Sequence, residues 1–117
     1  MGKFIALTGS DGQYYFNLIA SNGQVILSSE GYSTDYERDN GIHSILANSI
    51  LSIGFENKMT SNGKYYFVLR AANGELIGHS ELYTSVASRD NGIESVKNNA
   101  RYAEIDMDSY PMAKMRS

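Results

Sequence analysis

The sequence predicts an α+β protein in which a β-β-β-α unit occurs twice and forms an antiparallel sheet covered by two helices. A five-residue motif occurs at Arg38–Ile42 and again at Arg89–Ile93, an offset of 89 − 38 = 51 residues. At this offset Gly12–Ser49 aligns with Gly63–Ala100 over 38 positions without a gap, with 19 identities. Identity at half of the positions is far above chance, so the chain is a tandem duplication. In each copy, strand-like alternation precedes a helical pattern.

The duplication divides the chain into residues 1–52 as the first repeat, 53–103 as the second and 104–117 as a C-terminal tail. A chain of 117 residues is one small domain, or two half-domains that share a core. We therefore expect the two repeats to form one globular unit with a pseudo-two-fold axis. The repeated motif is Arg38, Asp39, Asn40, Gly41 and Ile42 in the first copy and Arg89, Asp90, Asn91, Gly92 and Ile93 in the second.

The first strand of each repeat is expected at Phe4–Thr8 and Phe55–Met59. In the second copy Phe55, Asn57 and Met59 share one face, and the two charged residues between them take the other. A two-residue turn after this strand would place those charges opposite core residues of the next strand. We therefore expect a longer or bulged connection.

The second strand is expected at Gln13–Ala20, where one face is identical in the two copies and the other has diverged. Asn22-Gly23 and Asn73-Gly74 then predict two-residue hairpins, because both central residues of a type I′ turn need positive φ. The third strands follow at Val25–Glu30 and Leu76–Glu81. A two-residue turn predicts these cross-strand pairs: Leu18 with Leu27, Ile19 with Ile26, Asn17 with Ser28, Tyr15 with Glu30, Val68 with His79, and Tyr66 with Glu81.

Helices are expected at Asp35–Ser49 and Val86–Ala100, with Thr34 and Ser85 as N-caps. The motif glycine lies inside each helix, where glycine costs about 1 kcal/mol relative to alanine. Its presence in both copies predicts close approach by another backbone, of a strand or of the partner helix. A turn at the Asn-Gly of the motif is the alternative, but nothing before it resembles a strand.

Residues Ile50–Gly54 link the copies, and the tail contains the only proline, Pro111. The residues after Ala100 are expected to add a short extended segment before the chain frays from Met112 onward.

Composition narrows the possible functions. The net charge of −3 and the pI near 5.3 argue against non-specific nucleic-acid binding, which normally needs a basic surface. With no cysteine there is no disulfide framework and no thiolate metal site. The apolar run at the N-terminus is too short for a signal peptide, and no stretch approaches the roughly 18 apolar residues of a membrane span. We expect a soluble cytoplasmic protein with no cofactor and no bound metal.

The motifs resemble the YegP-like family of small bacterial proteins, a domain of unknown function. The resemblance rests on Phe16–Ile26, Ser29-Glu30-Gly31-Tyr32 and Asn40–Ile45 and on their copies in the second repeat, and it covers the chain apart from the tail. It implies a tandem β-β-β-α fold, similar to a fused dimer of single-copy relatives. It implies no activity and no catalytic residues.

The candidate binding surface is Tyr15 with Glu30 and Tyr66 with Glu81, expected on one sheet face. The alternative is that each pair only stabilises the sheet, by up to about 1 kcal/mol. Arg38-Asp39 and Arg89-Asp90 are expected to form local ion pairs, worth under about 1 kcal/mol if exposed, rather than to recognise a partner. The two histidines, His43 and His79, have no histidine counterpart in the other copy and no metal-ligand spacing.

These observations favour a non-enzymatic interaction module with an unknown protein or small-molecule partner. One alternative is a small-ligand-binding protein or enzyme with its site at the repeat interface. A further alternative is nucleic-acid binding through exposed tyrosines. The fused-dimer pattern predicts a monomer or a weak homodimer, since unpaired sheet edges can support association.

Overall fold

The computed structural model describes residues 2–47 and 54–106. Its elements are, in order, β1 (Lys3–Thr8), β2 (Tyr14–Ile19), β3 (Val25–Ser29), α1 (Asp35–Ala47), β4 (Gly54–Met59), β5 (Tyr65–Arg70), β6 (Leu76–His79), α2 (Val86–Ala100) and β7 (Glu104–Asp106). The predicted tandem β-β-β-α order is confirmed, and both helices span the motif glycine as expected. The end predicted for the first helix at Ser49, most of the linker Ile50–Gly54 and the tail beyond Asp106 lie outside the described residues.

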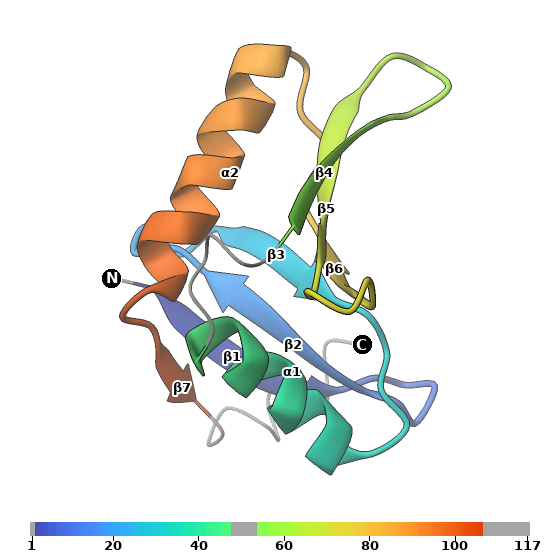
Figure 1. The fold of residues 1–117 in the computed structure, drawn as a ribbon, viewed down its shortest axis with the longest axis vertical. Coiled ribbons are helices and arrows are strands. Elements are labelled where there is room, and N and C mark those ends of the chain that lie inside the picture. Colours follow the sequence, from blue (N-terminus) through green and yellow to red (C-terminus); the bar gives the residue numbers. More distant parts are fainter. Residues whose placement is uncertain (1, 48–53, 107–117) are drawn as a thin grey trace.

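The seven strands form one sheet in the order β4-β5-β6-β3-β2-β1-β7. The repeats join through the antiparallel pair β3–β6, where Ser28 lies opposite His79. These two residues are equivalent in the two copies (79 − 28 = 51), so the pseudo-two-fold axis passes between them. Figure 1 shows the strong twist of the sheet, with β4 and β5 steep and β1 and β2 running across the view.

The extended segment predicted after Ala100 is β7, which follows α2 directly and lies beside β1 (Figure 1). It runs parallel to β1, with Phe4 opposite Ile105. The sheet is therefore mixed, although all its other pairs are antiparallel.

One core lies between the sheet and the two helices, which pack on the same face. Strands and helices of both repeats contribute to it through Phe4, Phe16, Leu18, Ile26, Leu27, Ile42, Ile45, Phe67, Leu69, Ile77, Val96 and Ala100. The identical face predicted for the second strands, with Phe16 and Leu18 in one copy and Phe67 and Leu69 in the other, is thus the core face. The expected longer connection between β4 and β5 is also confirmed, because Glu56 lies opposite Val68, away from the core position of Leu69.

The type I′ geometry predicted for the Asn-Gly turns is wrong, because only Gly23 and Gly74 have positive φ and the two asparagines do not. One predicted pair of the first repeat is also wrong, and the second repeat has the same register shift, between Leu69 and Arg70. Leu18 pairs with Leu27 and Asn17 with Ser28 as expected, but Ile19 pairs with Val25 instead of Ile26. A bulge leaves Ile26 as an extra residue, and Ile26 is only 6% exposed within the core. Burial of one more apolar side chain favours this shift over the regular two-residue hairpin.

Both helix starts are capped as predicted. The Thr34 hydroxyl accepts a hydrogen bond from the amide of Glu37 at 3.1 Å, and the Ser85 hydroxyl accepts from the amide of Ser88 at 3.1 Å. Each cap satisfies one of the free amides of the first helical turn. No helix in residues 2–47 and 54–106 is long and apolar enough to cross a membrane.

Candidate functional site

The arginine of the repeated motif packs on a tyrosine of its own repeat. The Arg38 guanidinium lies 5.6 Å from the centre of the Tyr14 ring, and Arg89 lies 5.8 Å from the ring of Tyr65. The Arg38 Nε donates to Asp39 at 2.9 Å. The Arg38 residue is only 3% exposed. A buried cation over an aromatic face holds the start of β2 against the helix, so this part of the motif acts inside the fold.

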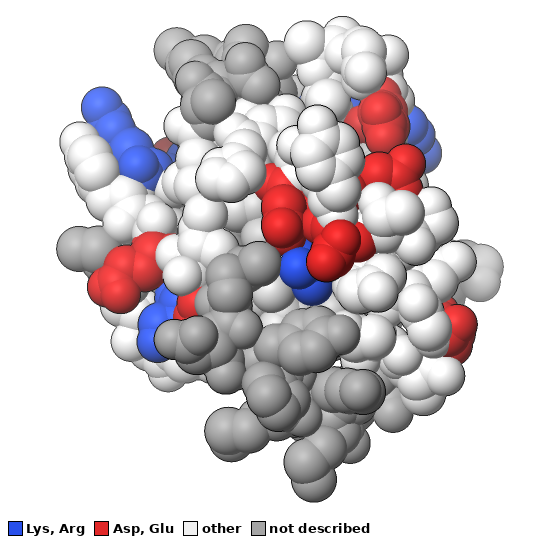
Figure 2. Space-filling view, turned by 90° about the horizontal axis from the view of Figure 1, so that it is seen from below, with Lys and Arg blue, Asp and Glu red and all other residues white. Residues whose placement is uncertain are grey.

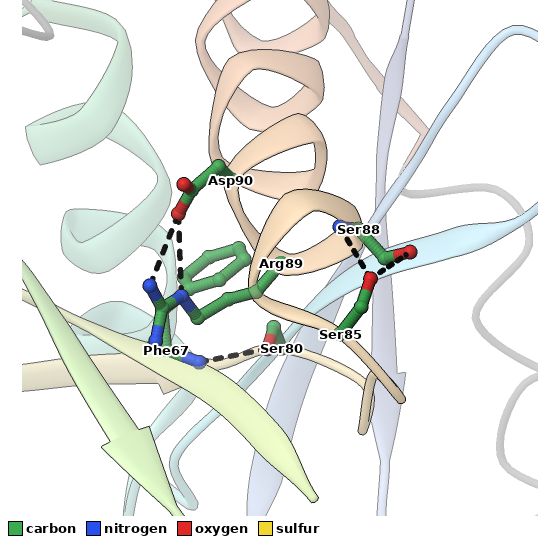
Figure 3. Close-up of polar contacts among 6 residues, drawn as sticks. All are labelled: Phe67, Ser80, Ser85, Ser88, Arg89 and Asp90. Atoms are coloured by element: carbon green, nitrogen blue, oxygen red, sulfur yellow. Dashed lines mark hydrogen bonds and ion pairs between the residues drawn. The ribbon is translucent and has the colours of Figure 1, made fainter.

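Figure 3 shows the arginine–aspartate pair of the second repeat. Arg89 extends from α2 and donates to the Asp90 carboxylate through two nitrogens, at 3.3 and 3.2 Å. Nearby, the buried Ser80 hydroxyl accepts a hydrogen bond from the amide of Phe67 at 3.0 Å. Both arginine–aspartate pairs are local, as predicted.

The motif glycine makes room for a tyrosine side chain. A Cβ atom at Gly41 would lie 2.7 Å from the Tyr32 hydroxyl, and at Gly92 it would clash with the hydroxyl and ring of Tyr83. The prediction that another backbone approaches these glycines is therefore wrong. Tyr32 stacks on Phe16 with ring centres 6.4 Å apart, which brings its hydroxyl end against the helix. The tyrosine comes from the loop between β3 and α1, whose position the sequence pattern does not reveal.

In the candidate surface, Tyr15 and Glu30 were expected to pair across two strands, but each makes its polar contact with another residue. The Tyr15 hydroxyl donates to the Asp11 carboxylate at 2.5 Å. This bond holds the pKa of Asp11 below its usual value and raises the pKa of Tyr15. The Glu30 carboxylate lies 3.6 Å from the His79 imidazole of the other repeat. Glu30 therefore pairs across the pseudo-two-fold axis when the imidazole is protonated.

The equivalent residues of the second repeat, Tyr66 and Glu81, also have other neighbours. Tyr66 is half-buried and stands opposite Lys58 of β4. Glu81 is exposed and lines a groove beside Tyr83. The structure thus brings neither tyrosine–glutamate pair together through a hydrogen bond, and the role of these four residues as a binding surface stays a prediction.

The pseudo-two-fold arrangement creates a groove that needs both repeats. We call it the first groove; its volume is about 290 Å³. The first repeat provides its helix side and its tyrosine, and the second repeat provides the β5–β6 hairpin. Its lining residues are Tyr32, Glu37, Asn40, Gly41, Ser44, Ala71, Asn73, Glu75 and Ile77.

The first groove is acidic around the phenol of Tyr32. Burial raises the pKa of Tyr32, and so do the negative charges of Glu75, Glu30 and Glu37. The Glu37 carboxylate also accepts from the Ser33 hydroxyl at 2.7 Å, a bond that lowers the pKa of Glu37. The groove therefore presents carboxylates at neutral pH beside an aromatic ring, a combination that attracts cations.

A second groove of about 430 Å³ lies at the related position across the axis, lined by Gln24, Val25, Ile26, Glu81 and Tyr83. It places Tyr83 where the first groove has Tyr32. However, Gln24 takes the position of Glu75, and Ser88 takes the position of Glu37. The two grooves therefore share an architecture and differ in charge, because two carboxylates line the first groove and one, that of Glu81, lines the second.

Sequence reasoning did not find the grooves. One signal was available: Tyr32 and Tyr83 are identical in a segment where their neighbours differ. What the pattern lacked was the partner, because Glu75 approaches Tyr32 only after the two repeats join.

One face of the molecule carries charges of both signs. In the face drawn in Figure 2, acidic and basic side chains are interspersed among uncharged ones, and no patch of one sign dominates the residues that are coloured. In the part of the chain that the structure describes, no three acidic or histidine side chains gather as metal ligands.

Comparisons with known proteins agree with the duplicated architecture. The family model "Domain of unknown function (DUF1508)" matches the chain twice, over residues 10–50 and 60–106. The chain is 45% identical over 95 residues to a UPF0339 protein of Pseudomonas aeruginosa, covering 81% of this chain and 86% of that one. It is also 45% identical over 98 residues to the UPF0339 protein YegP of Escherichia coli K12, covering 84% and 89% of the two chains.

Two solved structures have the same fold. The solution structure of YegP from Escherichia coli, a protein of unknown function, has a TM-score of 0.77 at 40% identity, covering 91% of this chain and 93% of that one. The solution structure of a UPF0339 protein from Shewanella oneidensis has a TM-score of 0.81 at 40% identity, covering 91% and 90%.

Proposed function

The chain belongs to the UPF0339 family, whose DUF1508 domain it carries twice, and we propose that it is a non-enzymatic binding module that takes a cationic ligand in its first groove. The observation that carries this proposal is the composition of the groove, which combines Tyr32 of one repeat with Glu75 of the other. Because neither repeat forms the groove alone, a ligand bound there depends on the tandem arrangement.

The chemistry of the groove favours an ammonium or guanidinium group. Carboxylates of Glu37 and Glu75 and the ring of Tyr32 border the same space. A cation between them gains charge-assisted hydrogen bonds and contact with an aromatic face. The matching ligands are a small polyamine-like cation or a basic side chain of a partner protein.

The groove is too small for an extended protein surface. Its volume of about 290 Å³ is near the lower end of small-molecule sites. It therefore suits a single basic group, with any remaining part of the ligand outside.

Agmatine, which carries both a guanidinium and an ammonium group, tests the proposal. Titration at low salt, followed by ¹H–¹⁵N NMR, should shift the amides of Tyr32, Gly41 and Glu75. Glu75→Gln keeps the shape and removes one charge, and it should weaken binding about tenfold, since a hydrogen bond to a charged group contributes roughly 1.5–3 kcal/mol. Unchanged affinity of this variant, or shifts confined to residues outside the first groove, would exclude the proposal.

The second groove offers a matched control. Gln24→Glu places a carboxylate at the position that corresponds to Glu75, beside Tyr83. This variant should acquire a second set of agmatine-dependent shifts around Tyr83, while the first groove binds as before. Glutarate, an anion of similar length, should shift neither set.

A further inference from the structure

The outer edge of β4 is the longer of the two terminal edges of the sheet in the described residues, since β4 has six residues and β7, at the other end, has three. β4 stands at the end of the strand order and pairs with β5 along its whole length, from Gly54 opposite Arg70 to Met59 opposite Tyr65. On its other side it has no neighbouring strand among the described residues. Six residues of extended backbone therefore present an edge on which another strand can pair.

The equivalent strand of the first repeat accepts such a neighbour. β1 occupies the same place in its repeat, and three residues of β7 pair along its outer side, from Lys3 opposite Glu104 to Ile5 opposite Asp106. The fold is thus compatible with a strand beside this edge. The second repeat differs in that no described segment of the chain provides one.

The side chains of β4 alternate between two faces of the sheet, one with apolar residues and the other with charged ones. Phe55 points into the core side, where its ring meets Phe67 edge-on with centres 5.7 Å apart. On the same face farther along, Met59 is 63% exposed. The opposite face carries Glu56 and Lys58, whose charged atoms are 3.5 Å apart.

This pattern is complementary to itself in one antiparallel register. If two copies pair about Asn57, then Glu56 of each copy lies opposite Lys58 of the other on one face. On the other face Phe55 of each copy lies opposite Met59 of the other. Two charge pairs and two apolar pairs form at once, and the exposed methionine is covered.

Neighbouring registers are unfavourable. Pairing about Glu56 or about Lys58 would place two like charges directly opposite each other, and a parallel in-register pair would set every charge beside its own kind. We propose that the β4 edge is a self-association surface, on which a second copy of this chain adds its own β4 antiparallel about Asn57. The result is a continuous sheet across two molecules.

Cysteine cross-linking tests the register directly, because the chain contains no cysteine. Asn57→Cys places two thiols opposite each other on the dimer axis, with Cα atoms about 5 Å apart. In the matched control Glu56→Cys, the two Cα atoms are offset by two residues and lie roughly 8 Å apart, beyond the reach of a disulfide. Under mild oxidation the first variant should form a covalent dimer at least about tenfold faster than the second.

Charge exchange provides an independent test by sedimentation velocity over a concentration series. The wild-type chain should shift from monomer to dimer as concentration rises. Lys58→Glu and Glu56→Lys should each stay monomeric, because each creates like-charge pairs, and an equimolar mixture of the two should form a heterodimer. A wild-type chain that stays monomeric at millimolar concentration would overturn the proposal. So would a dimer that persists in Lys58→Glu and is not cross-linked through Cys at position 57.

Discussion

The two ends of the sheet begin from the same sequence pattern and finish in different environments. At the first-repeat end, β7 lies beside β1 and Ile42 of the motif is 1% exposed. At the second-repeat end, no described strand lies beside the outer edge of β4, and the equivalent Ile93 is only partly buried. The local contacts of the motif are reproduced, whereas its burial is not. Burial depends on what the rest of the chain adds around each copy.

The comparison of the two repeats also separates residues that maintain the fold from residues that set the charge of the grooves. Residues that are identical in the repeats, such as Arg38 and Arg89, make the same contact on a tyrosine. Residues that differ, such as Glu75 against Gln24, set the charge of the two grooves. Divergence between the copies therefore sets the charge on which the proposed binding function depends.

The largest expected effect tests the difference in burial between Ile42 and Ile93. Ile42→Ala should lower the free energy of unfolding by about 2–4 kcal/mol, because it leaves a cavity in the shared core. Ile93→Ala should cost less than about half as much, since part of its side chain is already in contact with water. Urea unfolding of the two variants measures both values. Equal losses would show that the two ends of the sheet are equally packed.

A smaller effect tests how closely the motif glycine of each helix packs against the tyrosine beside it. Gly92→Ala should destabilise the protein by about 1 kcal/mol, because overpacking against Tyr83 costs more than the helix propensity that alanine gains. Gly41→Ala should cost less, since its new Cβ would lie 2.7 Å from the Tyr32 hydroxyl and 3.1 Å from the Tyr32 ring, farther than the corresponding Tyr83 atoms lie from Gly92.

The double variant Gly92→Ala, Tyr83→Phe completes this test. Removal of the hydroxyl should recover part of the loss, which a double-mutant cycle on thermal unfolding quantifies. Stabilisation by Gly92→Ala alone would contradict the role assigned to the glycine.

The smallest effect concerns pH and the two β-turns that precede β2 and β5. The Tyr15 hydroxyl bond holds the pKa of Asp11 below its ordinary value of 3.8. The carboxylate therefore adds stability that is present above that pH and is lost as pH falls through the folded pKa. The second repeat has Asn62 at this position, where it accepts from the Thr60 hydroxyl at 2.5 Å and does not titrate.

Asp11→Asn should thus be slightly less stable than wild type near neutral pH, and the difference should shrink below the ordinary pKa. Unfolding midpoints in urea, measured for both proteins over a pH series, give this difference. A constant difference down to the acid limit would show that the Asp11 charge makes no contribution. Asn62→Asp is the matched change in the other repeat.

Much of the fold followed from local pattern. Alternation located β2, helical spacing located α1 and α2, and Thr34 and Ser85 were recognisable as caps because side-chain acceptors at a helix start act within three residues. The bulge at Ile26 was not predictable, because it depends on a gain in core burial that only the assembled helices provide. The contact between Tyr32 and Gly41 was not predictable either, because Tyr32 comes from a loop, and a loop has no periodicity that would indicate where its side chains lie.

The sequence by itself determined that the chain is a duplicated β-β-β-α unit, which of its faces are apolar, and that the charge of its repeats has diverged. These properties depend on spacing along the chain, which reflects the geometry of strands and helices. Only the tertiary structure decided that the repeats join through β3 and β6, that β7 lies beside β1 whereas no described strand covers the outer edge of β4, and that Glu75 faces Tyr32. Each of these contacts joins residues far apart in sequence, and their pairing is selected by the total burial of the folded core.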